Sequence, residues 1–290
     1  MSTDAKPTLI LMHGIGLGPW LWDRWAPFFE SQGFSCVRLT MPGHGDGSNP
    51  GVADLVAAAE GAVEKARGPC ILVGHSMSGL VAQLVAARHP EWSDSKLMGI
   101  VLVCPLPPGQ VRVTPDTRMV KNGLKLAPAF LLGKPLRVSK GSYTELGLNK
   151  LPQNDIDEVF PKILPWPNKL AKELLLPPKV DIEAIRCPVL VVAGKEDRLV
   201  PWDKARVLGD LYEAVVWRYD NLAHTAPLEP GGERMGEDVA RWCAAPERPR
   251  VLESEGFAPT EGVGHTLRRQ RRGEEMKKRS AYGQKASAHR

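Results

Sequence analysis

The sequence predicts an α/β fold in which a mostly parallel sheet carries helices on both faces and a helical segment is inserted near the middle of the chain. Short apolar runs of strand length alternate with helical patterns over residues 8–103, which is typical of parallel strands buried on both faces. The alternation stops over residues 105–185 and resumes over residues 188–242. These observations predict a core of residues 1–104 and 186–245 around a cap insertion of residues 105–185.

The first half of the core is predicted to contain four strands with three helices between them. Each expected strand is an apolar run, and the helices end at glycine or proline, which are the usual stop signals. Strand–helix–strand units in this order form right-handed crossovers between parallel strands. The expected strands are Thr8–Gly14, Phe34–Leu39, Cys70–Val73 and Leu97–Val103, and the expected helices are Trp22–Gln32, Val52–Arg67 and Met77–His89.

The insertion is rich in Pro, Lys and Leu and shows no clear buried strand, with helices expected at Thr117–Leu126 and Pro167–Leu175. The strand and helix signals then return and complete the sheet. The expected strands of this second half are Pro188–Gly194 and Ala214–Tyr219, and the expected helices are Trp202–Leu211 and Glu229–Trp242.

Residues 246–290 hold 11 Lys and Arg against 6 Asp and Glu, which accounts for the whole net charge of +5. The segment has too few apolar residues to offset the entropy of ordering it, so we expect a disordered basic tail. Contact of this tail with an acidic partner is the alternative. The rest of the chain has no charge bias toward nucleic acid or a membrane surface.

The composition also excludes several classes of protein. No apolar run approaches the roughly 18 residues of a membrane span, and the polar N-terminus lacks the layout of a secretory signal. The cysteine count is odd, there is no CxxC, and most cysteines fall in or beside expected strands, so we expect reduced core residues of a cytoplasmic protein. They are Cys36, Cys70, Cys104, Cys187 and Cys243.

The stretch GHSMSG at residues 74–79 follows an expected strand and opens an expected helix. A serine on such a sharp turn is exposed at the carboxyl edge of the sheet, and the helix supplies a backbone N–H to a developing oxyanion. Centred on Ser76, the stretch departs from G-x-S-x-G only at Ser78, so Ser76 is the predicted nucleophile. Ser78 begins a face of small residues with Ala82 and Ala86, and we expect it to pack there with its hydroxyl bonded into the first helical turn.

The serine needs a base, because a hydroxyl is a weak nucleophile on its own. His224 follows the last expected strand and precedes the last expected helix, which returns it to the same edge of the sheet. His13, His44 and His75 each lie at a turn and are expected to orient loops or fill the edge, while His89 is expected at the surface. His224 is therefore the predicted base.

The base in turn needs a carboxylate to orient it. Asp197 and Glu196 both follow the strand that ends at Gly194, and the G-x-x-D spacing favours Asp197 at the strand-end turn. The loop after the strand Leu97–Val103 offers no competing carboxylate. The chain order of serine, acid and histidine is then the one found in hydrolases with a nucleophile elbow.

A second oxyanion donor is expected after the first strand, in the stretch HGIGLGPWLW. The Ile15 N–H is the natural partner of the Met77 N–H. The glycines Gly14, Gly16 and Gly18 could also suggest a dinucleotide loop, but their spacing does not match G-x-G-x-x-G.

These residues together resemble the α/β-hydrolase family. The matching stretches are LMHGIG, MPGHGDGS, VGHSMSG, AGKEDRLVP and LAHTAPLEP, which cover residues 8–104 and 187–243 with a cap insertion between them. Two departures are Ser78 in place of the elbow glycine and Thr40 where many members have aspartate. Members with an aspartate nucleophile are excluded by Ser76.

The resemblance implies a Ser76–His224–Asp197 triad that cleaves an ester, lactone or thioester through an acyl-enzyme, with no metal or organic cofactor. A neutral, apolar small-molecule substrate is expected, because the predicted surroundings are apolar. The same triad could serve a carbon–carbon bond hydrolase, a lyase, a perhydrolase or a ligand receptor without turnover. The expected pocket residues are Trp20, His75 and Phe130, with Leu126, Leu131 and Leu132 as further roof residues of the cap.

Overall fold

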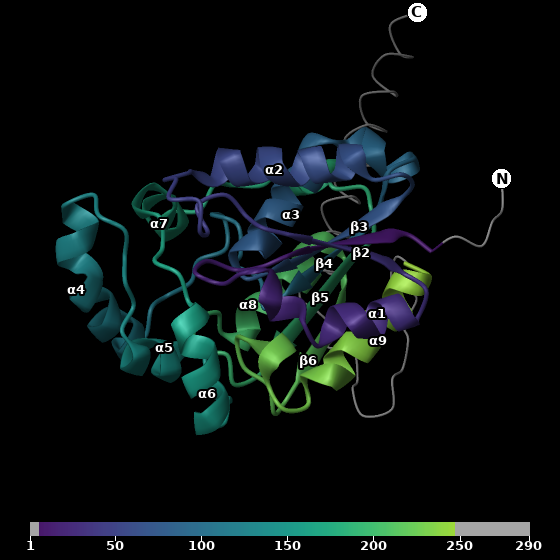
Figure 1. Ribbon diagram of the computed structural model, residues 1–290. Coiled ribbons are helices and arrows are strands. Elements are labelled where there is room, and N and C mark those ends of the chain that lie inside the picture. Colours follow the sequence, from purple (N-terminus) through teal and green to yellow (C-terminus); the bar gives the residue numbers. More distant parts are fainter. Residues whose placement is uncertain (1–5, 247–290) are drawn as a thin grey trace, which may run out of the picture.

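A computed structural model describes residues 6–246, and within them six strands form one parallel sheet in the order β2-β1-β3-β4-β5-β6 (Figure 1). Every neighbouring pair runs parallel, so the predicted fold class is confirmed. The strands are β1 (Thr8–Met12), β2 (Ser35–Leu39), β3 (Cys70–His75), β4 (Leu97–Val103), β5 (Val189–Gly194) and β6 (Val215–Tyr219).

Side chains of the central strands alternate between two hydrophobic clusters, because successive residues of a strand point to opposite faces. Leu9 and Leu11 of β1 belong to one cluster, and Ile10 and Met12 belong to the other. The first cluster is closed by α1 (Trp25–Ser31) and α9 (Gly232–Ala244), and the second by α2 (Val52–Lys65), α3 (Met77–Arg88) and α8 (Trp202–Tyr212). The sheet is thus covered on both faces.

The helix expected at Trp22–Gln32 is divided in the structure. A short 3₁₀ helix, η1 (Pro19–Trp22), precedes α1, which begins at Trp25. Pro27 lies in the first turn of α1, where proline is tolerated because its missing N–H has no helical acceptor. The other 3₁₀ helices are η2 (Pro90–Asp94), η3 (Phe160–Lys162), η4 (Ile182–Ala184) and η5 (Ala226–Leu228).

Four helices lie between β4 and β5, and Figure 1 shows them at one end of the molecule. They are α4 (Thr117–Leu131), α5 (Lys140–Leu146), α6 (Gln153–Val159) and α7 (Asn168–Leu175). Their loops bond to loops that follow strands: Leu164 N–H donates to the Gly16 carbonyl at 2.8 Å, and the Thr225 hydroxyl donates to the Gly147 carbonyl at 2.8 Å. This segment therefore lies over the carboxyl edge of the sheet.

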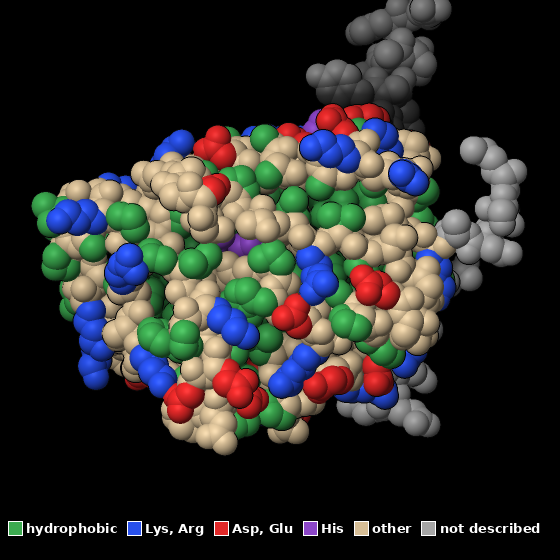
Figure 2. Space-filling view, in the orientation of Figure 1, with side chains coloured by type: hydrophobic (Ala, Val, Ile, Leu, Met, Phe, Trp, Pro, Cys, Tyr) green, Lys and Arg blue, Asp and Glu red, His purple; other side chains and the backbone are tan. Residues whose placement is uncertain are grey.

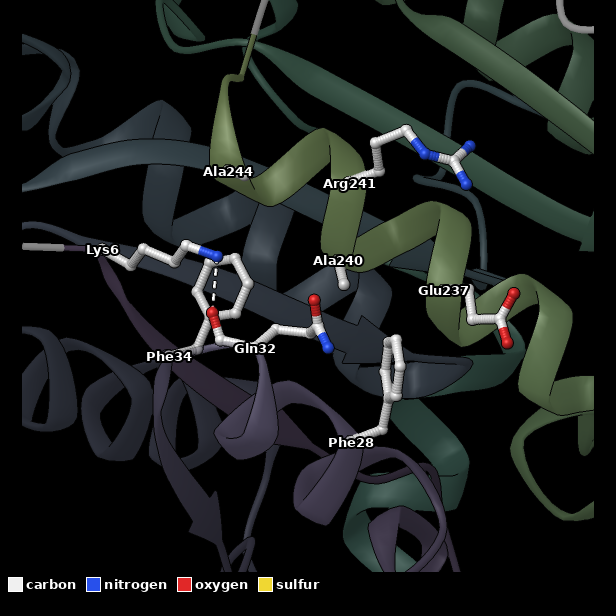
Figure 3. Close-up of a pocket in the computed structure, with 8 residues that line it drawn as sticks. All are labelled: Lys6, Phe28, Gln32, Phe34, Glu237, Ala240, Arg241 and Ala244. Atoms are coloured by element: carbon white, nitrogen blue, oxygen red, sulfur yellow. Dashed lines mark hydrogen bonds between the residues drawn. The ribbon is translucent and has the colours of Figure 1, made fainter.

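A surface depression lies between α1 and α9 at the opposite, amino edge of the sheet (Figure 3). Lys6 donates to the Gln32 carbonyl at 2.5 Å, and its ammonium lies 4.7 Å from the centre of the Phe34 ring. The residues that line it are Lys6, Phe28, Gln32, Phe34, Glu237, Ala240, Arg241 and Ala244.

No helix of the described chain is long and apolar enough to cross a membrane. The basic tail predicted for residues 246–290 lies, apart from Pro246, outside the described residues.

Candidate active site

Ser76 occupies a tight turn between β3 and α3. Its backbone has φ 53° and ψ −118°, a strained conformation for a residue with a side chain. The turn closes only because its flanks are glycines. A Cβ on Gly74 would lie 2.2 Å from the Ser78 carbonyl oxygen, and one on Gly79 would lie 2.6 Å from Cβ of Pro105. The sequence therefore builds the elbow that lifts Ser76 off the end of β3.

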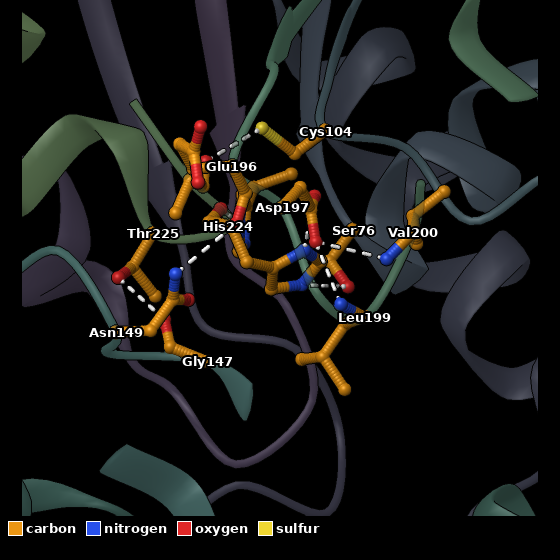
Figure 4. A network of polar contacts seen from close by, with 12 residues as sticks. Ser76, Cys104, Gly147, Asn149, Glu196, Asp197, Leu199, Val200, His224 and Thr225 are labelled. Atoms are coloured by element: carbon orange, nitrogen blue, oxygen red, sulfur yellow. Dashed lines mark hydrogen bonds and ion pairs between the residues drawn. The ribbon is translucent and has the colours of Figure 1, made fainter. Parts of the chain in front are cut away.

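The three predicted triad residues are in hydrogen-bonding contact (Figure 4). Nε2 of His224 lies 2.9 Å from the Ser76 hydroxyl, and Nδ1 of His224 lies 2.8 Å from Oδ2 of Asp197. The side chains of His224 and Asp197 are 5% and 0% exposed, whereas Ser76 is half-buried. A base thus lies between a partly accessible hydroxyl and a carboxylate shielded from water.

The Asp197 carboxylate is fixed by its own loop. Its Oδ1 accepts the backbone N–H groups of Leu199 and Val200 at 2.8 and 2.9 Å, which leaves Oδ2 for His224. Gly194 allows this loop to approach the histidine loop, because a Cβ there would lie 2.3 Å from the Leu222 carbonyl oxygen. The rival carboxylate considered from the sequence, Glu196, is exposed.

The segment between β4 and β5 is tied to both loops that carry Asp197 and His224. Asn149 donates to the Glu196 carbonyl at 3.0 Å, beside Asp197, and the Thr225 hydroxyl donates to Gly147, beside His224. Figure 4 shows these contacts on one side of the triad. A displacement of the segment around Gly147 would therefore act directly on the loops that hold the acid and the base.

His75 was expected to line the substrate pocket, but the structure gives it a different environment. It is completely buried, and its Nε2–H donates to the His224 carbonyl at 2.7 Å. Burial lowers the pKa of His75 well below its usual value, so the ring is neutral. In the described chain its Nδ1 has no hydrogen-bond partner. His75 thus holds the backbone of the base, and nothing exposes it to a ligand.

Two further buried histidines brace the loop that carries Ile15. His13 accepts the Met41 N–H at 3.1 Å through Nε2, and His44 accepts the Gly16 N–H at 3.0 Å. Burial lowers the pKa of His13 to about 3 and also lowers that of His44, so both rings are neutral and can accept. Their expected role as loop-orienting residues agrees with these contacts.

Ile15 lies in the loop after β1, and Met77 directly follows Ser76 as the first residue of α3. Gly14 packs against the nucleophile, because a Cβ there would lie 3.0 Å from Cβ of Ser76. Neither N–H takes part in the loop and cap hydrogen bonds of residues 6–246. Their role as oxyanion donors stays a prediction.

Ser78 is completely buried, as its predicted packing role requires. Its hydroxyl, however, does not bond into the first turn of α3. It donates to the His13 carbonyl at 2.5 Å and so joins α3 to the Ile15 loop. The sequence could not reveal this contact, because the acceptor is a backbone atom from a distant loop.

Sequence reasoning missed Glu229, a buried carboxylate five residues after His224. It accepts the N–H groups of Ala223 at 2.6 Å and Thr225 at 3.1 Å, which flank the base on both sides. Burial raises the pKa of Glu229 to about 7. The only acid of the stretch LAHTAPLEP, which also carries His224, was the available signal.

The other residues expected at the pocket differ in how far they are buried, and few contacts define their positions. Trp20 is half-buried, and Phe130 is half-buried between α4 and α7, with the Lys172 ammonium 5.3 Å from its ring centre. Leu131 and Leu132 are 80% and 69% exposed, which does not fit a roof over an enclosed pocket. No group of three or more His, Cys, Asp or Glu side chains that could hold a metal ion occurs among the described residues.

Comparisons with known proteins identify the family and the fold. Residues 9–242 match the alpha/beta hydrolase family. A pimeloyl-[acyl-carrier protein] methyl ester esterase of Neisseria meningitidis serogroup B is 30% identical over 213 residues, which cover 68% of this chain and 78% of the relative. Phospholipase YtpA of Bacillus subtilis is 27% identical over 216 residues, 69% of this chain and 78% of the relative.

Solved structures share the fold at low sequence identity. A pyrethroid hydrolase from Sphingobium faniae superposes with a TM-score of 0.62 at 20% identity, covering 83% of this chain and 98% of the other. A monoacylglycerol lipase from Paleococcus ferrophilus gives a TM-score of 0.63 at 21% identity, covering 83% and 96%. With the fold, the elbow and the family match in agreement, the chain belongs to the alpha/beta hydrolase family.

Proposed function

We propose that this protein is a serine hydrolase that cleaves a carboxylic ester through an acyl-enzyme. The observation that carries the proposal is the continuous hydrogen-bonded line from the Ser76 hydroxyl through His224 to the buried Asp197. The names of the relatives, which include an esterase and a phospholipase, support an ester as the substrate class.

In the first half-reaction the Ser76 oxygen attacks the ester carbonyl while Nε2 of His224 takes the hydroxyl proton. Asp197 keeps the proton on Nδ1, so that Nε2 is free to accept, and stabilises the imidazolium that forms. His224 then gives its proton to the departing alcohol as the carbon–oxygen bond breaks. The product of this step is an acyl group on Ser76.

In the second half-reaction water takes the place of the alcohol. His224 removes a proton from water as it attacks the acyl-enzyme, and returns a proton to the Ser76 oxygen as the acid leaves. In both steps the Ile15 and Met77 N–H groups would hold the negative oxygen. Each such donor is worth about 10²–10³ in rate in comparable enzymes.

The substrate that we propose is a neutral, apolar ester, lactone or thioester, since Ile15 and Trp20 have apolar side chains and are only half-buried. We assign residues 105–185 as a cap domain over the carboxyl edge. The five cysteines are free in the structure, which is compatible with the cytoplasmic location that their pattern predicts.

The direct test is labelling with a fluorophosphonate probe, which reacts with activated serines. We expect the wild-type protein to be labelled and Ser76→Ala to be unlabelled, with kcat on a p-nitrophenyl ester reduced by about 10⁴-fold or more. Ser78→Ala is the matched control and should keep the label, because its hydroxyl is bonded to His13. Labelling that survives in Ser76→Ala, or is lost only in Ser78→Ala, would refute the assignment.

A panel of esters then tests the substrate class. Methyl esters and thioesters of increasing acyl length should show kcat/KM rising with apolar length, because each buried CH₂ contributes about 0.8 kcal/mol. A preference for charged or very polar acyl groups would contradict the proposed apolar pocket.

A further inference from the structure

The outer face of α4 carries an unusual row of exposed aliphatic side chains. Val120, Leu124 and Leu131 are 48%, 68% and 80% exposed, and their spacing of four and seven residues places them on one side of the helix. Leu132 follows the last turn and is 69% exposed. We refer to these four residues as the outer stripe.

The outer stripe is not needed to hold α4 in place. The opposite side of the helix carries Asn122, which is 4% exposed and donates to Glu145 at 3.0 Å, and Lys125, which donates to Ser142 at 3.3 Å. These contacts attach α4 to α5. A helix with one anchored face normally presents polar residues on the other, so the exposed leucines require a separate explanation.

The apolar surface is concentrated on this part of the molecule. Six of the eight exposed large hydrophobic residues of the described chain belong to α4 and its C-terminal end or to the end of α7, where Leu175 and Leu176 are 68% and 87% exposed. The other two, Val37 and Met98, are exposed by 43% and 37% and lie in strands. The end of α7 follows Lys172, whose ammonium contacts Phe130 of α4.

Basic side chains accompany the outer stripe. The sequence of α4, TRMVKNGLKLAPAFL, holds one Arg and two Lys and no acidic residue. Arg118 pairs with Asp116 at the start of the helix, whereas Lys121 and Lys134 are exposed. Figure 2 shows hydrophobic and basic side chains next to each other at the end of the molecule formed by α4.

This combination selects among possible partners. A second copy of the chain would place Lys121 and Lys134 against the same residues of the first copy, because a two-fold interface pairs a patch with itself. An acidic protein would match the lysines but would need a groove for the protruding leucines. A bilayer with anionic headgroups satisfies both, since amphipathic helices with Leu and Lys bind at that boundary.

We propose that the outer face of α4 is a docking site for an anionic phospholipid surface. Leu124, Leu131 and Leu132 enter the boundary between headgroups and acyl chains, and Lys121 and Lys134 contact headgroup phosphates. The site lies outside the triad and its loops, so the proposal does not depend on the ester hydrolysis proposed above.

The test is co-sedimentation of the full chain with vesicles of equal parts phosphatidylglycerol and phosphatidylcholine, compared with phosphatidylcholine alone. We expect binding to the anionic vesicles, and weaker binding at high salt. Leu124→Gln and Leu131→Gln should each weaken partitioning about tenfold, and Lys121→Gln and Lys134→Gln about fivefold each. Val37→Gln and Met98→Gln are matched controls and should bind as the wild type.

Three results would overturn the proposal. One is the absence of sedimentation with anionic vesicles at low salt. Another is binding that salt removes but the leucine variants keep, which would point to a purely electrostatic contact elsewhere, as with an acidic protein. The third is leucine-dependent self-association without vesicles in analytical ultracentrifugation. Circular dichroism and thermal unfolding of each variant confirm that it is folded, and the exposed positions should leave both unchanged.

Discussion

Glu229 shows how a single residue can fix the predicted base, His224, through the backbone on either side of it. Its two carboxylate oxygens accept the backbone N–H groups on either side of His224, while the His224 carbonyl accepts from His75. The base is thus held by three backbone contacts and one side-chain contact to Asp197. A carboxylate is required here because it has only acceptors.

Replacement of Glu229 by glutamine should lower kcat, while the variant should still fold. The glutamine amide offers one acceptor oxygen and one NH₂ group, so one flanking N–H of the histidine loop would face another donor. We expect kcat to fall by about 10- to 100-fold with KM little changed, because a small displacement of the base misaligns it with Ser76. Steady-state kinetics on a p-nitrophenyl ester measure both constants.

The pH profile separates positioning from simple destabilisation. Only ionised Glu229 accepts both N–H groups, and its pKa is about 7, so it contributes to a rise of wild-type kcat through neutral pH. The variant should lose that contribution. Glu237→Gln, on the exposed side of α9, is the control. Unchanged kcat and an unchanged profile in Glu229→Gln would show that Glu229 does not position the base.

The residues that the sequence predicted and those that it missed differ in what they contact. Ser76, Asp197 and His224 follow strands at the same edge, so the strand pattern, together with the GHSMSG motif and the G-x-x-D spacing, indicated that they meet. Glu229 and the hydroxyl of Ser78 act on backbone atoms of loops, and no residue pattern shows where a loop backbone will lie. His75 was expected at a pocket for the same reason, since its acceptor is a backbone carbonyl.

At the scale of elements, the turn from β3 to α3 depends on the absence of a side chain at Gly74. Gly74→Ala would place a Cβ 2.2 Å from a backbone oxygen of α3, which a flexible side chain cannot relieve. We expect a loss of several kcal/mol in the free energy of unfolding, as for other overpacked sites, together with loss of fluorophosphonate labelling.

Gly61→Ala in α2 is the matched control, because no atom lies within 4 Å of a Cβ there. Alanine should stabilise this helix by about 0.5–1 kcal/mol. Urea unfolding followed by circular dichroism compares the two variants. Equal stabilities would mean that the elbow does not need glycine at residue 74.

The elements themselves were predicted where periodicity and stop signals agree. The strand Leu97–Val103 has the same bounds in the structure, and the helix expected at Met77–His89 ends one residue earlier. The short helices α5 and α6 were missed, because each has only seven residues and too few turns for an apolar period. The helix α4 continues to Leu131 past Pro128, although proline normally ends a helix.

At the scale of the whole molecule, four buried ionisable groups surround the candidate site with opposite effects on stability. His13, His44 and His75 are held neutral, each with its pKa below the ordinary value of 6.5. Glu229 has its pKa raised from 4.5 to about 7. Because all four lie on loops or strand ends at one edge of the sheet, their titration should act on the site and on folding together.

We therefore expect the free energy of unfolding to fall as the pH drops below about 6.5. The unfolded chain then takes up protons on these histidines more readily than the folded chain does, and a histidine that stays neutral, such as His13, contributes about 1.4 kcal/mol per pH unit. Glu229 acts in the opposite direction between pH 4.5 and 7, because the folded state keeps a proton that the unfolded state loses. The lowered pKa values of the three histidines outweigh the single raised carboxyl, so the net slope should be toward lower stability on acidification between pH 4.5 and 6.5.

Urea unfolding at intervals between pH 5 and 7.5 measures this slope, and Glu229→Gln provides an internal check of its sign. Without the opposing carboxyl, the variant should lose stability more steeply on acidification, by about 1.4 kcal/mol per pH unit. His13→Asn should have a shallower slope, since one of the three histidines is gone, even though its stability at pH 7.5 is lower. A stability that is flat from pH 5 to 7 in the wild type would show that the buried histidines are not neutral in the folded protein.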